Sequence, residues 1–402
     1  MFSSRRFGVL AVLVMGIALI VSPYAVAQPA TQIQASGTAW SSAWAQSNES
    51  GFDNDPQNEL VSALVSFNGE LWAGTYNSLS GEGFQLWRMN SSGEWYPEWE
   101  GDPDDSTTVA VDHMIVFSDT LFVSFWDEAN GGVVYSFDGT DWSEASEPGF
   151  GDPTNGEVFR MAVFSDTLYA STWSYTSTHG AEIWRSSTGT QYDWTQVVSN
   201  GFGDANNASV LSFAVLNNTL YAGTFNATTG GEIWRSTTGN AGSWSQVNTA
   251  GFGDANNRGI SALAVFSNSL YASTRGNTGF GTQVWRCQVC NGSDWVKVVD
   301  NGFGNADTNH MNALEVFDGH LYLVVGNMTT GLEVWRTADG TDWVQVGFAG
   351  FDTADNRSTY WDNAVAVHNG RLYVGTVNWI DGGEVWLYLP DTVYLPLTLR
   401  DY

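Results

Sequence analysis

Basic residues are scarce in this chain. It contains a single lysine, Lys297, and 14 Lys and Arg against 43 Asp and Glu, which gives a formal net charge of −29 at pH 7. A surface of this sign repels a phosphate backbone, so we expect no nucleic acid as a partner. A glycan or an extracellular protein remains compatible with it, and the charge alone also keeps a protein in solution.

Cysteine is nearly absent. The two that occur, Cys287 and Cys290, stand in the sequence CQVC directly after a strand-like segment. A redox pair with this spacing is expected at the start of a helix, and zinc needs two further ligands that no nearby histidine supplies. We therefore expect a disulfide that holds a hairpin turn.

Long apolar segments are limited to one run, residues 7–21. The run follows Arg5 and Arg6 and precedes the small-residue sequence Ala25-Val26-Ala27. This order predicts a secretory signal peptide over residues 1–27, and the run is too short for a membrane span. We expect a secreted or cell-surface monomer without a membrane span.

A segment of about 50 residues repeats along the rest of the chain. Copies begin with Gly-Phe at Gly51, Gly149, Gly201, Gly251, Gly302 and Gly350, and a degenerate copy begins at Gly101. A period of this length with several short strands in each copy predicts an all-β, seven-bladed β-propeller over residues 28–390. Residues 391–402 form a C-terminal tail.

Each copy is expected to contain four strands. In the fourth copy they cover residues 210–216, 219–225, 231–236 and 243–247. A pair of residues that tolerates positive φ joins the first two strands of every copy, which predicts tight hairpins. The pairs are Asn68-Gly69, Ser118-Asp119, Ser165-Asp166, Asn217-Asn218, Ser267-Asn268, Asp318-Gly319 and Asn369-Gly370.

The last copy lacks a fourth strand. In five copies a fourth-strand Trp precedes the next Gly-Phe by seven residues, and Trp44 precedes Gly51 by the same distance. We therefore expect residues 38–50 to supply the outer strand of the last blade and to close the ring. Closure would remove the unpaired sheet edges of an open array.

The sequence GGEIWR, a polar turn and a following Trp resemble kelch-type propeller repeats. The Gly pair departs from that pattern, because it falls after the loop instead of closing the second strand. The turns at residues 136–142 and 337–343 resemble the Asp-box of sialidase-like propellers, one residue short. Both resemblances imply a β-propeller fold, and Asp-boxes are structural turns, so the likeness implies no catalysis.

Acidic residues recur in the Gly-Phe loops, at Asp152, Asp204 and Asp254. Oxygen-rich loops can hold calcium, which is the one cofactor that the sequence leaves open. Asx side chains equally bond their own backbone and fix a turn. We favour the turn interpretation, since no copy has the closely spaced acids of a dedicated calcium loop.

Aromatic and amide residues recur where the second strands end. An aromatic ring stacks on the apolar face of a sugar, and amides and carboxylates bind its hydroxyl groups. The alternative is that these rings pack inward and contact no ligand. The predicted ligand-binding residues are Tyr76, Asn77, Trp126, Asp127, Trp173, Phe225, Asn226, Arg275, Asn327, Asn378 and Trp379.

Four acids lie on or just before the innermost strands: Asp112, Glu157, Glu315 and Asp362. A propeller glycosidase needs two carboxyl groups that face each other across the central mouth. These four come from different repeat positions, however, so we rank catalysis below binding. The neighbouring His113 and Arg160 occupy equivalent positions in consecutive copies.

The sequence thus favours a secreted binding module that recognises glycans through loops on one face. A structural or protein-binding surface protein is the alternative, and a glycoside hydrolase or lyase is the second alternative.

Overall fold

Extended strands and short 3-10 turns make up the regular structure of this protein. The computed structural model describes residues 43–77, 83–100, 108–174 and 179–390, which belong to one compact unit. The predicted signal peptide, the start of the degenerate copy at Gly101 and the C-terminal tail lie outside the described residues. No α-helix occurs in these ranges, and none of their helical turns has the length and apolarity needed to cross a membrane. The prediction of an all-β chain is confirmed.

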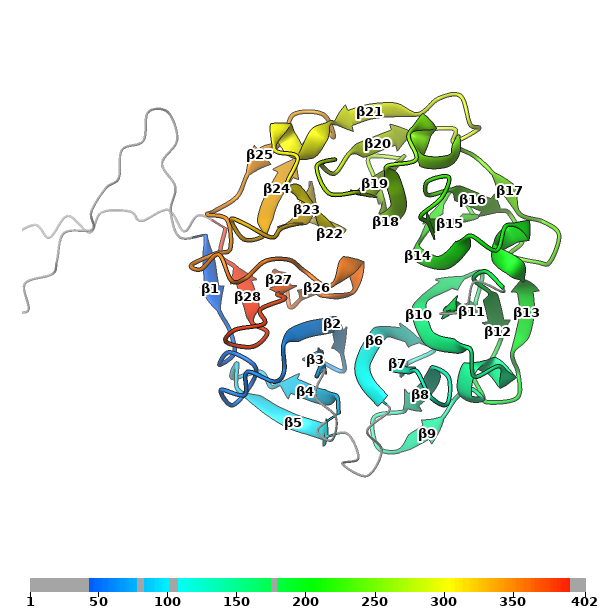
Figure 1. Ribbon diagram of the computed structural model, residues 1–402. Helices are drawn as coiled ribbons and strands as arrows, with labels where there is room; N and C mark the ends of the chain where they lie inside the picture. The colour runs from blue at the N-terminus through cyan, green and yellow to red at the C-terminus, as the bar shows by residue number, and fades with distance from the viewer. Residues whose placement is uncertain (1–42, 78–82, 101–107, 175–178, 391–402) are drawn as a thin grey trace, which may run out of the picture. The chain divides into compact units, whose positions relative to one another are not determined.

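The strands form successive antiparallel groups of four. The first groups are β2 (Leu60–Phe67), β3 (Glu70–Tyr76), β4 (Gln85–Met89) and β5 (Trp95–Glu100); β6 (Thr108–Phe117), β7 (Thr120–Asp127), β8 (Val133–Phe137) and β9 (Trp142–Glu144); and β10 (Asn155–Phe164), β11 (Thr167–Ser174), β12 (Ile183–Ser186) and β13 (Thr195–Val198). They are followed by β14 (Asn207–Leu216), β15 (Thr219–Asn226), β16 (Ile233–Ser236) and β17 (Ser245–Gln246); β18 (Asn257–Phe266), β19 (Ser269–Gly276), β20 (Val284–Cys287) and β21 (Val296–Val299); and β22 (Thr308–Phe317), β23 (His320–Asn327), β24 (Glu333–Thr337) and β25 (Val344–Gln345). Figure 1 shows these groups arranged around a common centre, with the first strand of each group innermost.

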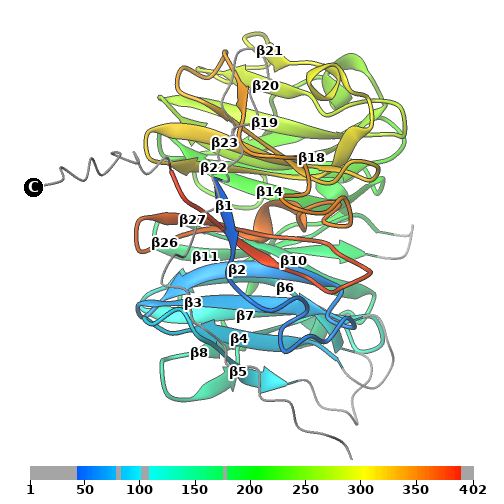
Figure 2. The ribbon, with the colours of Figure 1, turned by 90° about the vertical axis from the view of Figure 1, so that its left-hand side faces the viewer.

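Both ends of the described chain contribute to the last sheet. It contains β26 (Val365–His368), β27 (Arg371–Gly375), β28 (Val385–Tyr388) and β1 (Trp44–Gln46), in the order β1-β28-β27-β26. Trp44 pairs with Tyr388, and Figure 2 shows the blue N-terminal strand lying against the red C-terminal strands. A bridge between Leu60 and Val377 connects this region to β2. The first and last groups therefore contact each other directly.

Tight hairpins join the first two strands of every group, as the sequence predicts. Both residues of each of the seven turn pairs have positive φ, between 45° and 80°. Asn, Asp and Gly tolerate this conformation, and its twist matches the right-handed twist of the flanking strands. The hairpin prediction is confirmed.

The Gly-Phe segments form compact turns, four of which contain a 3-10 element: η1 (Pro148–Gly151), η2 (Asn200–Gly203), η3 (Ala250–Gly253) and η4 (Asn301–Gly304). The Phe of each segment has φ between 53° and 63°. For a bulky side chain this left-handed conformation costs roughly 1–2 kcal/mol. Packing of the ring against a Trp offsets that cost, as described below. Farther along, Cys287, the last residue of β20, forms a disulfide with Cys290, as the sequence predicts.

Candidate functional site

A cluster of four residues repeats where neighbouring groups meet. The Phe of each described Gly-Phe pair lies face to face with the third-strand Trp, and their ring centroids are 3.8–5.0 Å apart. The indole N–H donates to a Glu or Gln two residues earlier, which also accepts a hydrogen bond from an Asn or Thr of the same copy. The clusters are Phe52-Trp87-Gln85-Asn58, Phe150-Trp184-Glu182-Asn155, Phe202-Trp234-Glu232-Asn207, Phe252-Trp285-Gln283-Asn257, Phe303-Trp335-Glu333-Thr308 and Phe351-Trp386-Glu384-Asn356.

The second group lacks this cluster. Val133 and Tyr135 replace the Glu or Gln and the Trp, Thr108 stands at the Asn position, and the sequence has Gly101-Asp102 in place of Gly-Phe. Trp99 of β5 meets Tyr135 edge-on instead, with ring centroids 5.3 Å apart. A pocket of about 490 Å³ remains between β5 and β8.

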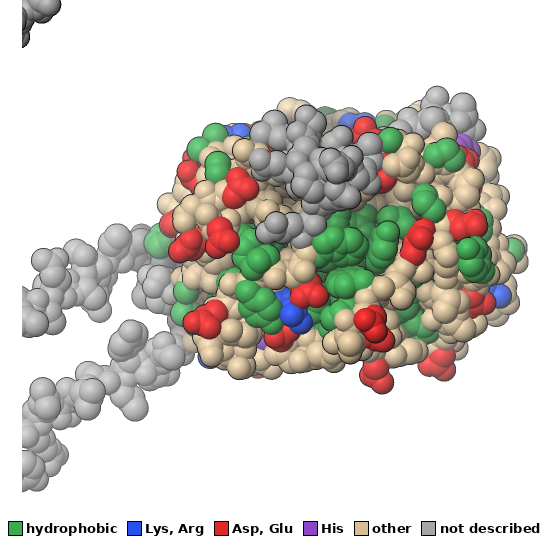
Figure 3. Space-filling model, turned by 90° about the horizontal axis from the view of Figure 1, so that it is seen from below, with side chains coloured by type: hydrophobic (Ala, Val, Ile, Leu, Met, Phe, Trp, Pro, Cys, Tyr) green, Lys and Arg blue, Asp and Glu red, His purple; other side chains and the backbone are tan. Residues whose placement is uncertain are grey.

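Aromatic rings form much of the wall of this pocket, which we call the junction pocket. Its aromatic lining consists of Phe84, Trp99, Phe125 and Tyr135, of which Trp99 and Tyr135 are only half-buried. Thr108, Asp127, Asn130 and Glu144 add polar atoms to the lining. Figure 3, which views the molecule from the side where β5 and β9 lie, shows hydrophobic side chains gathered beside charged ones. A hollow of this size with apolar walls and a few polar groups is typical of small-ligand sites.

The aromatic residues predicted to bind glycans pack against one another at the inner ends of the second strands. Tyr76 stacks on Trp126 with ring centroids 5.6 Å apart, and Trp173 meets Phe225 at 5.9 Å. Tyr76, Trp173 and Phe225 also join a buried core that contains Trp361. These four rings are half-buried and contact one another, and their stacking on a glycan stays a prediction.

Two further members of the predicted set differ from each other in exposure. Arg275 is half-buried, with its guanidinium 5.0 Å from the ring centre of Trp361. Trp379 is 41% exposed, and the Arg357 guanidinium lies 5.5 Å from its ring centre. Neither side chain borders the junction pocket.

The predicted amide ligands are buried and hold their own turns. Asn226, Asn327 and Asn378 each accept hydrogen bonds from two backbone N–H groups of the following turn, at 2.9–3.1 Å. Asn77 is 1% exposed. All four asparagines are buried, and their binding to glycan hydroxyl groups stays a prediction. Asp127 makes the same turn contacts, to Ala129 and Asn130, although it still borders the junction pocket.

The acidic residues proposed for calcium also hold turns. Asp152, Asp204 and Asp254 each accept a hydrogen bond from the backbone N–H two residues ahead, at 2.9–3.0 Å. The turn interpretation is confirmed for all three. Within the described ranges, no three His, Cys, Asp or Glu side chains gather as they would around a metal ion.

We expect calcium removal to leave stability unchanged, because these carboxylates already accept hydrogen bonds within the loops. A ligand that binds only the folded state raises the melting temperature with its concentration. The measurement is thermal unfolding in excess calcium and in excess chelator. A clear rise of the melting temperature in calcium that disappears in an Asp204→Asn variant would contradict this expectation.

The four candidate catalytic carboxyl groups come together around the centre as two pairs. Asp112 of β6 occupies a β-bulge between Val111 and His113, and such a bulge re-aims a side chain. Its carboxyl is fully buried, and neither oxygen has a hydrogen-bond partner among the described residues. Glu157 of β10 is its partner in the first pair, since the negative charge of Glu157 opposes the ionisation of Asp112. The second pair is Glu315 of β22 with Asp362 of η5 (Trp361–Asn363).

Burial sets the ionisation of this central region. It raises the pKa of Asp112 well above the ordinary range, and the negative charge of Glu157 raises it further. Burial and then Asp362 raise the pKa of Glu315 to about 8, and burial raises the pKa of Asp362 to about 6 against the opposing effect of Arg160. Burial and then Arg160 lower the pKa of His113. Close to pH 7 the Glu315 carboxyl and the His113 ring are therefore mostly neutral.

The residues that fill the centre were missed by the sequence analysis. Trp361 is 2% exposed with φ 52°, and its ring meets Phe159 edge-on at 5.7 Å. Asn363 donates from Nδ2 to the backbone oxygen of Asp112 at 2.5 Å. An irregular spacing in the sequence could have indicated them. Asn356 precedes its hairpin pair by thirteen residues, whereas Asn207 precedes its own by ten, so the last copy has three additional residues in the segment that contains Trp361 and Asn363.

No protein-family model matches the chain, and no curated protein matches it in sequence. Solved structures do resemble it. A puromycin-hydrolyzing peptidase of Mycobacterium tuberculosis is 11% identical with a TM-score of 0.53, over 84% of this chain and 53% of the peptidase. An ulvan lyase of a new polysaccharide lyase family is 11% identical with a TM-score of 0.50, over 85% of this chain and 94% of the lyase. Extracellular domains 1–2 of Drosophila semaphorin 1a are 11% identical with a TM-score of 0.50, over 86% and 88%.

The chain thus spans about half the length of the peptidase. At such low identity the likeness concerns the fold alone. It places the chain among proteins with β-propeller folds.

Proposed function

We propose that the chain is a closed seven-bladed β-propeller in which β1 completes the last blade. Three contacts support closure: the pairing of β1 with β28, the bridge between Leu60 and Val377, and a core in which Val61 of the first group packs with Val385 of the last. We also propose that the repeats are kelch-like and Asp-box-like. In support, Asp138 and Asp339 each accept hydrogen bonds from two backbone N–H groups of their own turn.

On this scaffold we propose carbohydrate recognition in the junction pocket. The observation that carries the proposal is the loss, in the second blade alone among the seven copies, of the Phe and Trp that close the other junctions. Their absence leaves aromatic rings, including those of Trp99 and Tyr135, around a hollow of about 490 Å³. Aromatic rings stack on the apolar faces of sugars, and nearby carboxylates and hydroxyls bind sugar hydroxyl groups.

Two further observations support the carbohydrate class and the setting. The ulvan lyase with a similar fold is bound to -[GlcA(1-4)Rha3S]-, a polysaccharide fragment. The N-terminal sequence resembles a secretory signal, and we propose that the protein acts outside the cell. Binding, not hydrolysis, is the proposed activity of this pocket, because four aromatic rings line it and one of its two carboxylates, Asp127, holds its own turn.

We expect the purified protein to bind at least one polysaccharide of a broad panel, with the junction pocket as the site. Replacement of Trp99 or Tyr135 by Ala removes a stacking face, so affinity should fall by about tenfold or more, which corresponds to roughly 1.4 kcal/mol. The double variant Val133→Glu with Tyr135→Trp restores two residues of the cluster found at other junctions and fills part of the hollow. It should abolish binding while the protein stays folded. The measurement is titration calorimetry with the best glycan.

The matched control is Tyr192→Ala. Tyr192 is 83% exposed and is not among the residues that line the junction pocket, so its loss should leave affinity unchanged. Binding that survives the junction variants would place the glycan elsewhere on the surface. An empty panel would overturn the carbohydrate proposal and favour a protein-binding or structural surface role.

A further inference from the structure

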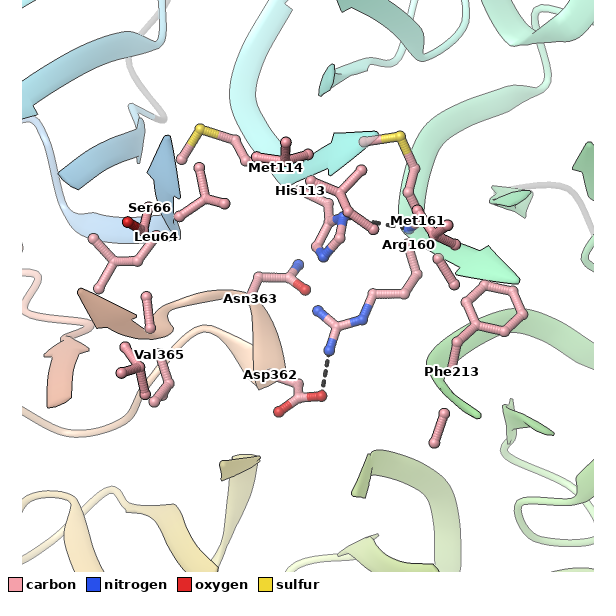
Figure 4. A pocket seen from close by; sticks show the side chains of 18 of the residues that line it. Leu64, Ser66, His113, Met114, Arg160, Met161, Phe213, Asp362, Asn363 and Val365 are labelled. Atoms are coloured by element: carbon pink, nitrogen blue, oxygen red, sulfur yellow. Dashed lines mark hydrogen bonds and ion pairs between the residues drawn. The ribbon is translucent and has the colours of Figure 1, made fainter. Parts of the chain in front are cut away.

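A second hollow lies over the centre of the strand groups, apart from the junction pocket. It has a volume of about 560 Å³ and is lined by residues of β2, β6, β10, β14, η5 and β26. Its walls are mostly aliphatic, with Leu64, Met114, Met161 and Val365 among them. Figure 4 shows that His113, Arg160, Asp362 and Asn363 lie between these walls and point toward one another. We call this hollow the central funnel.

The other repeats serve as internal controls for the polar residues of the funnel. His113 and Arg160 lie five residues before their hairpin pairs. The other copies have only Ala or Ser at this position: Ala63, Ser212, Ala262, Ala313 and Ala364. The fold therefore does not require a large polar side chain there. A burial cost that the other repeats avoid indicates a role other than holding the blades together.

Hydrogen bonds orient both side chains. Nδ1 of His113 accepts the backbone N–H of Met161 at 3.3 Å, so in the neutral ring the proton resides on Nε2. Arg160 donates from Nη2 to Oδ2 of Asp362, and Oδ1 of Asp362 accepts the backbone N–H of Leu314 at 3.1 Å. Nη1 of Arg160 is buried and has no hydrogen-bond partner among the described residues.

A buried guanidinium N–H without an acceptor is unfavourable, because the group has lost its hydrogen bond to water. An anion would supply the missing acceptor, and a charge-assisted bond to it would be stronger than a neutral one. The anion should carry a single negative charge, because the Asp362 carboxylate beside the guanidinium would repel a more highly charged one. Glu315 adds little repulsion near pH 7, because its carboxyl is then mostly protonated.

We propose that the central funnel binds an organic monocarboxylate, whose carboxylate meets Arg160 Nη1 and His113 Nε2 and whose apolar body lies against the aliphatic walls. The walls account for the apolar part: Val116, Val163 and Val215 line the hollow and are 36–41% exposed, so an apolar body against them would cover water-exposed surface on binding. A sugar ring, with hydroxyl groups on every edge, suits these walls less well. The site is therefore distinct in chemistry from the junction pocket.

The test uses hexanoate, with hexanol, hexylamine and acetate as probes of the same size or charge. We expect hexanoate to bind at least tenfold more tightly than hexanol and hexylamine, because only it supplies the acceptor. It should also bind more tightly than acetate, which lacks the apolar body. The measurement is saturation-transfer NMR or calorimetry at pH 7 with the purified protein.

Variants locate the site. His113→Leu should weaken hexanoate binding by about tenfold, the loss of one hydrogen bond to a charged group. The double variant Arg160→Met with Asp362→Leu removes the ion pair without leaving a buried charge alone, so it should fold and should abolish binding. Ser212→Ala, at the equivalent position of the next copy, should leave binding unchanged.

Three results would overturn the proposal: equal binding of hexanoate and hexanol, equal binding of hexanoate and acetate, or undiminished binding by the folded double variant. The outcome is separable from that of the carbohydrate proposal. The Trp99 and Tyr135 variants should keep hexanoate binding, and saturating hexanoate should not displace a bound glycan.

Discussion

We expect Trp44→Ala to lower the free energy of unfolding by roughly 3–5 kcal/mol, the usual cost of removing a buried Trp. Trp44 is 8% exposed, although it belongs to a strand of only three residues. Its ring packs against Phe351 at 4.8 Å and Tyr388 at 5.1 Å, and its Nε1 donates to the backbone oxygen of Val346 at 3.2 Å. One side chain thus connects the start of the described chain to two different late segments.

The reason for a global effect is the position of β1 at the edge of the last sheet. Without β1, the outer edge of β28 is unpaired, and an unpaired edge exposes a row of backbone donors and acceptors. We therefore expect hydrogen exchange to accelerate in β28 and β27 in the variant, in addition to the lower midpoint of urea unfolding. Chemical unfolding followed by calorimetry and fluorescence measures the loss.

The control for Trp44 is Trp379→Ala. Trp379 is 41% exposed, and surface substitutions of this kind usually change stability by about 0.5 kcal/mol or less. If the two variants unfold at the same midpoint, β1 does not hold the last sheet, and the proposal of a closed ring loses its main support.

The regular part of the fold could be predicted because the same pattern of strand and turn residues recurs in each copy. The pair Asn217-Asn218 and its six equivalents all adopt positive φ, since a two-residue hairpin offers no other good geometry. The seven-residue spacing before Gly51 identified Trp44 as an outer-strand residue, and the structure pairs it with Tyr388. In both cases local chemistry and the repeat pointed to the same result.

The sites depended on departures from the repeat, and these were harder to interpret. In the sequence, an Asn that binds a sugar looks the same as an Asn that bonds its own turn, such as Asn226. Only the backbone conformation distinguishes the two roles. The bulge at Asp112 recurs at the same position of β2, β10, β14 and β18, so the side-chain direction there does not follow from simple alternation. The departure from the repeat is the carboxyl group that β6 carries at this position. The sequence did contain the clue to the junction pocket. The second copy has Tyr135 where the other copies have a third-strand Trp, and it lacks the Gly-Phe pair.

The pH dependence of stability should contain a large contribution from Glu315. Its pKa is raised to about 8 in the folded protein, first by burial and then by Asp362, from 4.5 as the ordinary value. An acid whose pKa is higher in the folded state binds its proton more tightly there, so its contribution is most favourable below pH 4.5. Stability is then lost progressively as the pH rises from 4.5 to 8, while the unfolded chain ionises first.

Glu315→Gln removes this titration, so the variant should gain stability over the parent protein across the same window. A shift from 4.5 to about 8 corresponds to roughly 4–5 kcal/mol. Because the side chain is only half-buried, we expect about half of that at pH 8 and almost nothing at pH 4.5. The measurement is urea unfolding of both proteins at several pH values between 4.5 and 9.

Other buried acids, Asp112 and Asp362 among them, also weaken the parent protein as the pH rises. The slope of the parent alone therefore cannot be assigned to Glu315, and the difference between the two proteins is the informative quantity. Glu128→Gln, a change at an exposed glutamate, serves as the control and should give a difference near zero throughout. A Glu315→Gln difference that stays constant from pH 4.5 to 9 would mean that this carboxyl ionises equally in the folded and unfolded chains. An ionised Glu315 would then repel an incoming carboxylate. Hexanoate should in that case bind the central funnel of the parent protein more weakly at pH 7 than it binds the Glu315→Gln variant.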